Sequence, residues 1–323
     1  MNVIICTEGN LNMGMGHVYR TLTLADELDY HVTFFTKSGE DVIDKIKGHG
    51  YEVVCASDDE VVFELLDTPP KKIVIFDRLD IDPSLARRIK EKGHGLVIFG
   101  SLSSAKECAD IVINVIGSDF TNCSWVDGVQ STIFFQGPKY YIFKKSFFEQ
   151  IYEENKPEPG RCLFLFGGAD NLNLTVGGLE ALYGKPGINN IDIIIGAGYH
   201  HMGSLIRTME RFSDGAMIRL YRDVENVAEI MAKAETVITS PGMSMFEAFL
   251  LKRKVIAFAQ NKFQTQVFGN HFRVIESESI MNLYDIIKGN DVMDPTSKLI
   301  TDMKIGQGKN EILSAIARLG ERV

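Results

Sequence analysis

Short apolar runs alternate along the chain with longer segments of helical period. Apolar runs of strand length occupy residues 3–6, 31–35, 53–56, 73–76, 96–99 and 111–115, and again 162–166, 191–195, 217–220, 236–239 and 255–259. Between the runs, segments such as residues 224–234 repeat apolar positions at helical spacing. Continuous apolar strands that alternate with helices are typical of parallel βαβ units. The pattern therefore predicts an α/β protein built from doubly wound parallel sheets.

A polar, proline-containing segment at residues 153–160 separates the two series of strands. Such a segment is typical of a linker between domains. We therefore expect two Rossmann-like domains, an N-terminal one over residues 1–154 and a C-terminal one over residues 155–323. In doubly wound sheets, ligands bind at the carboxyl ends of the strands, so we expect the chemistry in strand-to-helix loops that face a cleft between the domains.

Composition and charge narrow the class of protein. The 323 residues are 45% apolar, and 34 Lys+Arg against 43 Asp+Glu give a formal charge of −9. This excludes a disordered or fibrous chain. Because no basic run exceeds the three residues at 252–254, the sequence offers no electrostatic surface for a nucleic-acid backbone.

The cysteines and histidines predict neither disulfides nor a metal site. Five scattered cysteines without a Cys-x-x-Cys spacing are typical of a reduced, cytoplasmic protein. No segment approaches the ~18 apolar residues of a membrane span, so we expect no integral membrane segment. The adjacent His200 and His201 would diverge by about 100° on a helix, which argues against a metal site.

A glycine-containing loop follows the first predicted strand and leads into a helix. Gly14 and Gly16 allow close approach of backbone to a ligand, and the N–H groups of a helix start attract an anion. A dinucleotide fingerprint would need a third glycine at position 19, where the chain has Tyr19. The loop therefore does not predict an NAD site.

His17 follows these glycines at the start of the predicted helix. The positive end of the helix dipole favours the neutral imidazole, which can act as a general base. Alternatively, His17 only caps or packs the helix. Its position between two glycines and a helix favours the general base.

The predicted strand ends of the second half carry further candidate ligands. Gly167 and Gly168 permit either close approach to a ligand or a tight turn. Backbone N–H groups near Gly242 and Met243 are suited to a diphosphate, the Ser244 hydroxyl can donate to it, and Glu247 can accept ribose hydroxyls. Ser244 and Glu247 also have the spacing of a capping box, which needs no ligand. Gln264 offers an amide to sugar hydroxyls at the next strand end, although surface polarity explains it nearly as well.

These motifs together resemble a known group of proteins. Residues 14–20, 137–140 and 166–170, and then Ser244, Glu247 and Gln264, follow one another in the order seen in the nucleotide-sugar hydrolases of pseudaminic acid biosynthesis and their spore coat polysaccharide biosynthesis relatives. More distantly, the chain resembles the N-acetylglucosaminyltransferase that makes the peptidoglycan lipid precursor.

The resemblance implies a GT-B architecture that binds a UDP-sugar, without metal or cofactor, as a monomer or weak homodimer. It implies cleavage of UDP from a 2,4-diacetamido-2,4,6-trideoxy sugar at the anomeric carbon with inversion, with His17 activating the water. The backbone at Arg222 and Val224 would read the uracil. The complete set of implied substrate-binding residues is Gly14, Gly16, Arg20, Asp77, Gly167, Gly168, Arg222, Val224, Gly242, Met243, Ser244, Glu247 and Gln264.

Two departures bear on the sugar, one near Asp77 and the other at Gly100 and Ser101, where relatives often carry paired aspartates. The family pattern has an aromatic residue two positions after the aspartate, and this chain has Leu79 after Asp77. The resemblance therefore implies UDP as the nucleotide and leaves the identity of the sugar and of the acceptor open. Two alternatives stay open, namely a glycosyltransferase of the same fold, in which His17 deprotonates an acceptor hydroxyl, and a non-catalytic sugar-nucleotide binding protein.

Overall fold

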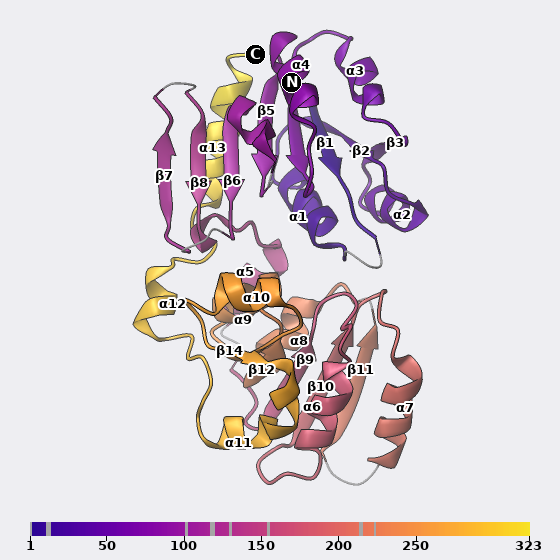
Figure 1. Ribbon diagram of the computed structural model, residues 1–323, viewed down its shortest axis with the longest axis vertical. Helices are drawn as coiled ribbons and strands as arrows, with labels where there is room; N and C mark the ends of the chain where they lie inside the picture. The colour runs from indigo at the N-terminus through magenta and orange to yellow at the C-terminus, as the bar shows by residue number, and fades with distance from the viewer. Residues whose placement is uncertain are drawn as a thin grey trace. The chain divides into compact units, whose positions relative to one another are not determined.

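The computed structural model describes residues 2–10, 14–100, 103–116, 120–128, 131–153, 156–212, 216–222 and 224–323. The chain forms two compact units. Unit 1 comprises Met1–Ile142 together with Gly306–Val323, and unit 2 comprises Phe143–Ile305. Each unit is a mainly parallel sheet covered by helices, as expected for an α/β protein (Figure 1).

The sheet of unit 1 has eight strands in the order β3-β2-β1-β4-β5-β6-β8-β7, and only the β7–β8 pair is antiparallel. Its strands are β1 (Asn2–Thr7), β2 (His31–Thr36), β3 (Glu52–Cys55), β4 (Lys72–Asp77), β5 (Gly95–Phe99), β6 (Ile111–Asn114), β7 (Cys123–Val126) and β8 (Ile133–Gln136). Its helices are α1 (Gly16–Ala25), α2 (Glu40–Gly48), α3 (Glu60–Leu66), α4 (Pro83–Glu91), η1 (Ser104–Cys108), η2 (Pro138–Tyr140) and α13 (Lys309–Gly320).

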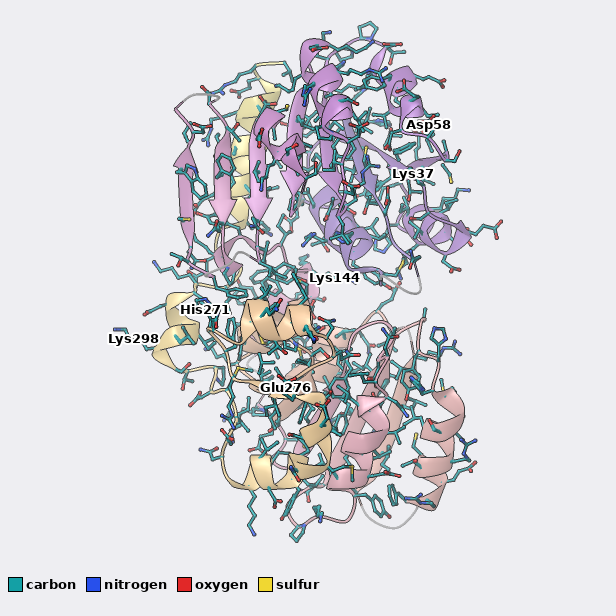
Figure 2. All side chains as sticks on the ribbon, viewed as in Figure 1. Lys37, Asp58, Lys144, His271, Glu276 and Lys298 are labelled. Atoms are coloured by element: carbon teal, nitrogen blue, oxygen red, sulfur yellow. The ribbon has the colours of Figure 1, made fainter. Side chains whose placement is uncertain are left out.

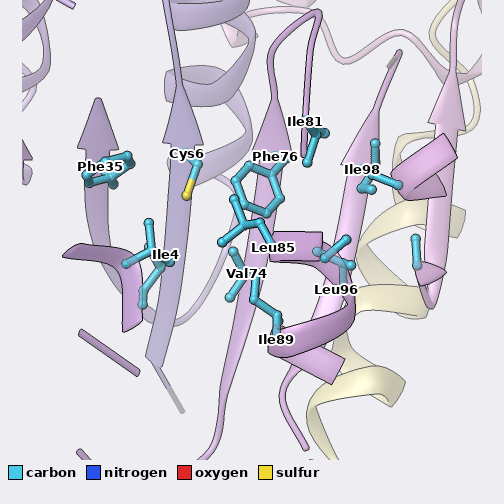
Figure 3. Packing of buried hydrophobic residues seen from close by; sticks show 14 of the residues in the cluster. Ile4, Cys6, Phe35, Val74, Phe76, Ile81, Leu85, Ile89, Leu96 and Ile98 are labelled. Atoms are coloured by element: carbon cyan, nitrogen blue, oxygen red, sulfur yellow. The ribbon is translucent and has the colours of Figure 1, made fainter. Parts of the chain in front are cut away.

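Strand alternation assigns each residue of this sheet to one of two faces. One face carries Cys6, Phe76 and Ile98, which pack with Leu85 and Ile89 of α4 in a buried cluster (Figure 3). Residues in alternate positions, including Thr7 and Asp77, therefore belong to the opposite face, where α1 and α13 contact the central strands. Successive strands are added to one side of β1 as far as β3 and to its other side from β4 onward, which makes the carboxyl ends of β1 and β4 the topological switch point of unit 1.

The sheet of unit 2 has six parallel strands in the order β11-β10-β9-β12-β13-β14, with its switch point between β9 and β12. Its strands are β9 (Arg161–Leu165), β10 (Asn190–Ile195), β11 (Met217–Arg222), β12 (Thr236–Thr239), β13 (Lys254–Ala259) and β14 (Val274–Glu276). Its helices are α5 (Lys145–Tyr152), α6 (Leu174–Leu182), α7 (Met202–Arg211), α8 (Val227–Lys233), α9 (Met243–Leu250), α10 (Lys262–Phe268), η3 (Ser277–Asn282), α11 (Leu283–Lys288) and α12 (Lys298–Asp302).

The division between the units differs from the expected boundary at residues 154 and 155. The helix α5, which precedes that boundary, packs on α8 of unit 2. The last helix α13, expected in the C-terminal domain, contacts β4 and β5 of unit 1 and is drawn in yellow beside that sheet in Figure 1. Burial of Ile312, Ile316 and Leu319 on its apolar face gives the physical reason.

Among the described residues, the helices are too short or too polar to cross a membrane.

Candidate functional site

The switch point of unit 1 brings together the loop after β1 and the end of β4. Because β1 and β4 are hydrogen-bonded neighbours, with Thr7 paired to Asp77, the end of β4 lies beside the glycine loop. His17 is the second residue of α1, which begins at Gly16 as the sequence predicted. Gly14 has a φ of +86° and donates its N–H to the Asn10 carbonyl at 2.8 Å, which closes the loop ahead of α1.

His17 and Asp77 form a close side-chain pair. Nδ1 of His17 lies 2.6 Å from Oδ1 of Asp77, and the Asp77 side chain is fully buried whereas that of His17 is 22% exposed. Because a carboxylate only accepts hydrogen bonds, Nδ1 carries the hydrogen and the lone pair of the neutral ring is on Nε2. The pair therefore fixes the tautomer in which Nε2 can take a proton.

Arg20, one helical turn after His17, completes this group. Its Nε donates to Oδ2 of Asp77 and its Nη2 to Oδ1, both at 2.6 Å, in a bidentate pair. Nη2 also lies 3.3 Å from His17 Nδ1, but both nitrogens are donors in this tautomer, so the contact is not a hydrogen bond. Burial of Asp77 opposes its charge, yet the Arg20 guanidinium and His17 together outweigh burial and hold the pKa of Asp77 below its usual range.

The sequence placed Arg20 and Asp77 among the substrate ligands, and the structure shows their side chains engaged with each other and with His17. The guanidinium of Arg20 also lies over the Phe99 ring, 5.6 Å from its centroid. Their positions support an orienting role toward His17, which the sequence analysis did not anticipate.

Two helices begin at the switch point of unit 2, and they differ in whether a side chain occupies their first turn. Asp170 accepts hydrogen bonds from the backbone N–H groups of Leu174 and Thr175, each at 2.9 Å, at the start of α6. The residue before α9 is Gly242, which has no side chain to cap the helix. A negatively charged ligand therefore finds unoccupied N–H groups at α9 rather than at α6.

The start of α9 also decides between the two interpretations of Ser244 and Glu247. A capping box would put Ser244 immediately before the helix, but the helix begins at Met243 and Ser244 is already its second residue. The capping-box alternative is therefore wrong. Within the described part of the chain, the Ser244 hydroxyl makes no hydrogen bond. Glu247 lies one turn further along α9 and is partly exposed.

Gln264 braces the loop that leads into α9. Its Nε2 donates to the Pro241 carbonyl at 3.0 Å, and its Oε1 accepts from the Gln260 N–H at 2.7 Å. Gln260 in turn donates to the Ser240 hydroxyl at 2.7 Å and to the Phe166 carbonyl at 2.9 Å. This network, which the sequence did not reveal, links the loops after β9, β12 and β13.

Gly167 and Gly168, the two glycines after β9, are required for different structural reasons. Gly167 has a φ of +79°, and a Cβ there would meet no atom within 4 Å, so its backbone conformation rather than crowding calls for glycine. The backbone of Gly168 comes so close to Gly196 that a Cβ on Gly196 would lie 2.6 Å from Gly168 Cα. The backbone at Gly168 therefore packs closely against another loop of the protein, and this contact accounts for the small residue whether or not a ligand binds there.

The predicted uracil-reading residues lie at the end of an edge strand. Arg222 is the exposed last residue of β11, and Val224 follows after residue 223, which lies outside the described residues. All strands of this sheet run parallel, so Arg222 ends at the same edge as the loops that carry Gly167 and Gly242.

A second charged cluster on unit 1 was missed by the sequence analysis. Arg78 is 2% exposed, and it pairs with Asp59 at 2.7 Å and with Glu8 at 3.1 Å. Lys37, labelled in Figure 2, lies 3.2 Å from Asp59 and 3.4 Å from Glu8. The Arg78 guanidinium lies over the Phe76 ring, 4.8 Å from its centroid, so the cluster lies on the face of Phe76, opposite to that of Asp77 and His17. Among the described residues, no group of three or more His, Cys, Asp or Glu side chains is arranged to hold a metal ion.

Comparison with curated proteins finds distant homologues of the kind that the sequence motifs resemble. The spore coat polysaccharide biosynthesis protein SpsG of Bacillus subtilis is 27% identical, over 82% of this chain and 79% of that protein. The UDP-2,4-diacetamido-2,4,6-trideoxy-β-L-altropyranose hydrolase of Campylobacter jejuni is 26% identical, over 82% of this chain and 94% of that protein. An uncharacterized protein of Methanocaldococcus jannaschii is 35% identical over 99% of this chain, which spans 66% of that protein's length.

Solved structures show the same fold at low sequence identity. Anabaena HepE in complex with UDP superposes with a TM-score of 0.56 and 11% identity, covering all of both chains. MurG of Acinetobacter baumannii superposes with a TM-score of 0.59 and 13% identity, over 98% of this chain and 99% of that one. The fold is therefore GT-B, as predicted. No protein-family model matches the chain.

Proposed function

We propose that this distant homologue of SpsG and of the Campylobacter jejuni UDP-sugar hydrolase is a metal-independent hydrolase of a UDP-activated amino-deoxy sugar, acting in surface polysaccharide or nonulosonic acid biosynthesis. The observation that carries the proposal is the contact of 2.6 Å between His17 Nδ1 and Asp77 Oδ1. It leaves Nε2 as a base at the switch point of unit 1, where ligands of doubly wound sheets bind.

Unit 2 supplies the proposed site for UDP. Asp170 already occupies the start of α6, so the diphosphate is assigned to the N–H groups at Gly242, Met243 and Ser244, with the Ser244 hydroxyl donating to it. Gly167 and Gly168 border this site across the switch point, and Gln264 holds its loop in place.

The nucleoside would lie further along the same sheet edge. Glu247 accepts from the ribose hydroxyls, and the backbone at Arg222 and Val224 reads the uracil. These assignments rest on the parallel order of the strands, which puts their carboxyl ends at one edge.

The proposed reaction is one displacement at the anomeric carbon. Nε2 of His17 takes a proton from water as the water oxygen bonds to that carbon, and the bond from the carbon to the diphosphate oxygen breaks on the opposite side. UDP leaves with the bonding electron pair, and the configuration inverts. Asp77 stabilises the imidazolium that forms, and the N–H groups of α9 stabilise the charge on the leaving diphosphate.

Release of UDP without an acceptor tests the proposal. The full chain is incubated with a panel of UDP-sugars that includes diacetamido-trideoxy hexoses, and free UDP is measured for the wild type, His17→Gln and Asp77→Asn. We expect release by the wild type, and a loss on the order of 10³-fold or more in kcat for both variants, because each removes the oriented base. Ser244→Ala is the matched control, in which UDP affinity falls several-fold because one hydrogen bond is lost.

The other outcomes distinguish the alternatives. UDP binding without release, followed by release once a sugar acceptor is added, would replace the hydrolase by a transferase in which His17 deprotonates an acceptor hydroxyl. Binding with no turnover under either condition would favour a non-catalytic binding protein. Leu79, which is 51% exposed where the family pattern has an aromatic residue, is the position at which the sugar preference is expected to differ.

A further inference from the structure

A cavity of about 210 Å³ opens on unit 1 beside the strands β6, β8 and β7. Its lining includes Val112 and Phe134, which belong to the face that packs on α4 and η1. His17 and Asp77 belong to the opposite face of the same sheet. The cavity is therefore separate from the site described above.

One wall of this cavity is aromatic. Trp125 of β7 is paired across the ladder with Phe134 of β8, and their rings stack with centroids 4.7 Å apart and planes 4° apart. The Trp125 residue is nevertheless 43% exposed. Phe134 holds the indole in one orientation, so the wall is a rigid apolar platform on the open side of the sheet.

The remaining lining is polar and comes from the strand ends. Asn114 and Gln136 are the last residues of β6 and β8 and lie directly opposite each other in the parallel register. Lys106 of η1 adds a positive charge. Considering the described residues alone, neither the Asn114 amide nor the Lys106 ammonium has a hydrogen-bond or ion-pair partner.

We propose that this cavity is a binding site for a single saccharide ring. A pyranose has an apolar C–H face, which fits the indole platform, and hydroxyls around its edge, which fit two neighbouring amides that both donate and accept. The cavity is smaller than the ~300–1,000 Å³ of sites for drug-sized ligands, so it suits one ring. Lys106 selects sugars that carry a carboxylate. The proposal does not rest on the proposed hydrolysis.

The test uses the fluorescence of Trp125, because the chain has one tryptophan. The full chain is titrated with glucose, glucuronic acid, N-acetylglucosamine and uridine. We expect a saturable change of emission with the sugars, tighter for glucuronic acid than for glucose. Asn114→Ala should weaken sugar binding about three- to tenfold, since one hydrogen bond is lost, while the melting temperature and UDP affinity stay unchanged. Lys106→Gln should abolish the preference for glucuronic acid.

Three results would overturn the proposal: no saturable change with any sugar, a response to uridine alone, or a sugar response that Asn114→Ala leaves intact. The UDP-release assay is independent of these results, because Asn114 and Lys106 lie on the other face from His17. A negative sugar titration therefore does not contradict the proposed hydrolase, and a negative UDP-release assay does not contradict this saccharide site.

Discussion

At the scale of single residues, the sequence predicted His17, Arg20 and Asp77 as site residues, but not that their side chains contact one another. The glycines and the helix start are local signals, so they can be recognised within a few residues of His17. Asp77 is 60 positions away, and its place beside His17 depends on β4 lying next to β1 in the sheet. That adjacency is a property of strand order, which the apolar pattern leaves open.

The buried group of Asp77, Arg20 and His17 predicts a specific pH dependence. Burial alone raises the pKa of Asp77, and Arg20, with a smaller contribution from His17, reverses that effect. In the variant Arg20→Gln, burial is opposed by His17 alone, so the pKa of Asp77 rises. Only an ionised Asp77 carries the negative charge that stabilises the imidazolium formed on His17 in the proposed reaction. We therefore expect the acid limb of kcat to move to higher pH, as measured by UDP release across pH.

Arg20→Lys is the matched control, because it keeps the positive charge and should shift the acid limb less. An acid limb that stays in place in Arg20→Gln would contradict the assigned role of Arg20. The ion pair of Arg20 and Asp77 also makes the folding stability depend on pH. The pKa of Asp77 lies below its unfolded value, so the stabilising effect is present above the usual carboxyl range and is lost as pH falls through the lowered pKa.

At the scale of elements, each predicted apolar run overlaps a strand of the structure, whereas three short strands were not predicted. β7 and β14 lack a continuous apolar run, and both are edge strands, where one side is open and the apolar pattern weakens. β8 carries three apolar residues in a row, Ile133 to Phe135, and was nevertheless not predicted. The start of α9 was also not predictable, since Ser244 and Glu247 fit two helix starts equally well by spacing.

The charged cluster between β1, β2, α3 and β4 gives a prediction for stability. Asp59 accepts from both Nη1 and Nη2 of the buried Arg78, at 2.7 and 2.9 Å. In Asp59→Asn, Arg78 keeps only Glu8 as an ionised partner. Removal of one partner of a buried pair costs about 3–5 kcal/mol. We expect a loss of this order or somewhat less, because Glu8 remains, measured by denaturant unfolding.

The neighbouring Glu60 provides the control for this measurement. It pairs with Arg88 on the surface, where both side chains are well exposed. Glu60→Gln should therefore change the unfolding free energy little. Equal effects of the two substitutions would show that the burial of Arg78 does not determine the cost.

At the scale of the whole molecule, the α/β class and the two sheets followed from the periodicity, whereas the division of the chain did not. Composition marks residues 153–160 as a linker, but tertiary packing assigns α5 to unit 2 and α13 to unit 1. The apolar face of α13 was visible in the sequence. Its packing partners, β4 and β5, lie more than 200 positions earlier and could not be read from it.

The division predicts which fragment folds alone. Unit 2 is one continuous segment, Phe143–Ile305, with its own buried core. We expect a fragment of these residues to unfold cooperatively and to bind UDP as the full chain does, measured by thermal unfolding and calorimetry. The control is a fragment of residues 155–323, which carries α13 without its sheet and lacks α5. It should be less stable and aggregate more readily, and equal behaviour of the two fragments would contradict the division.

The return of the C-terminal segment to unit 1 has a consequence for synthesis on the ribosome. Unit 2 is translated in full before the segment Gly306–Val323 exists, so it can fold while the earlier-made unit 1 still lacks a helix. Until that helix emerges, β4 and β5 lack the contacts of α13, and on that side of the sheet β4 is packed by α1. Unit 1, although translated first, therefore matures after unit 2, and chains interrupted before Gly306 should be the ones that chaperones retain.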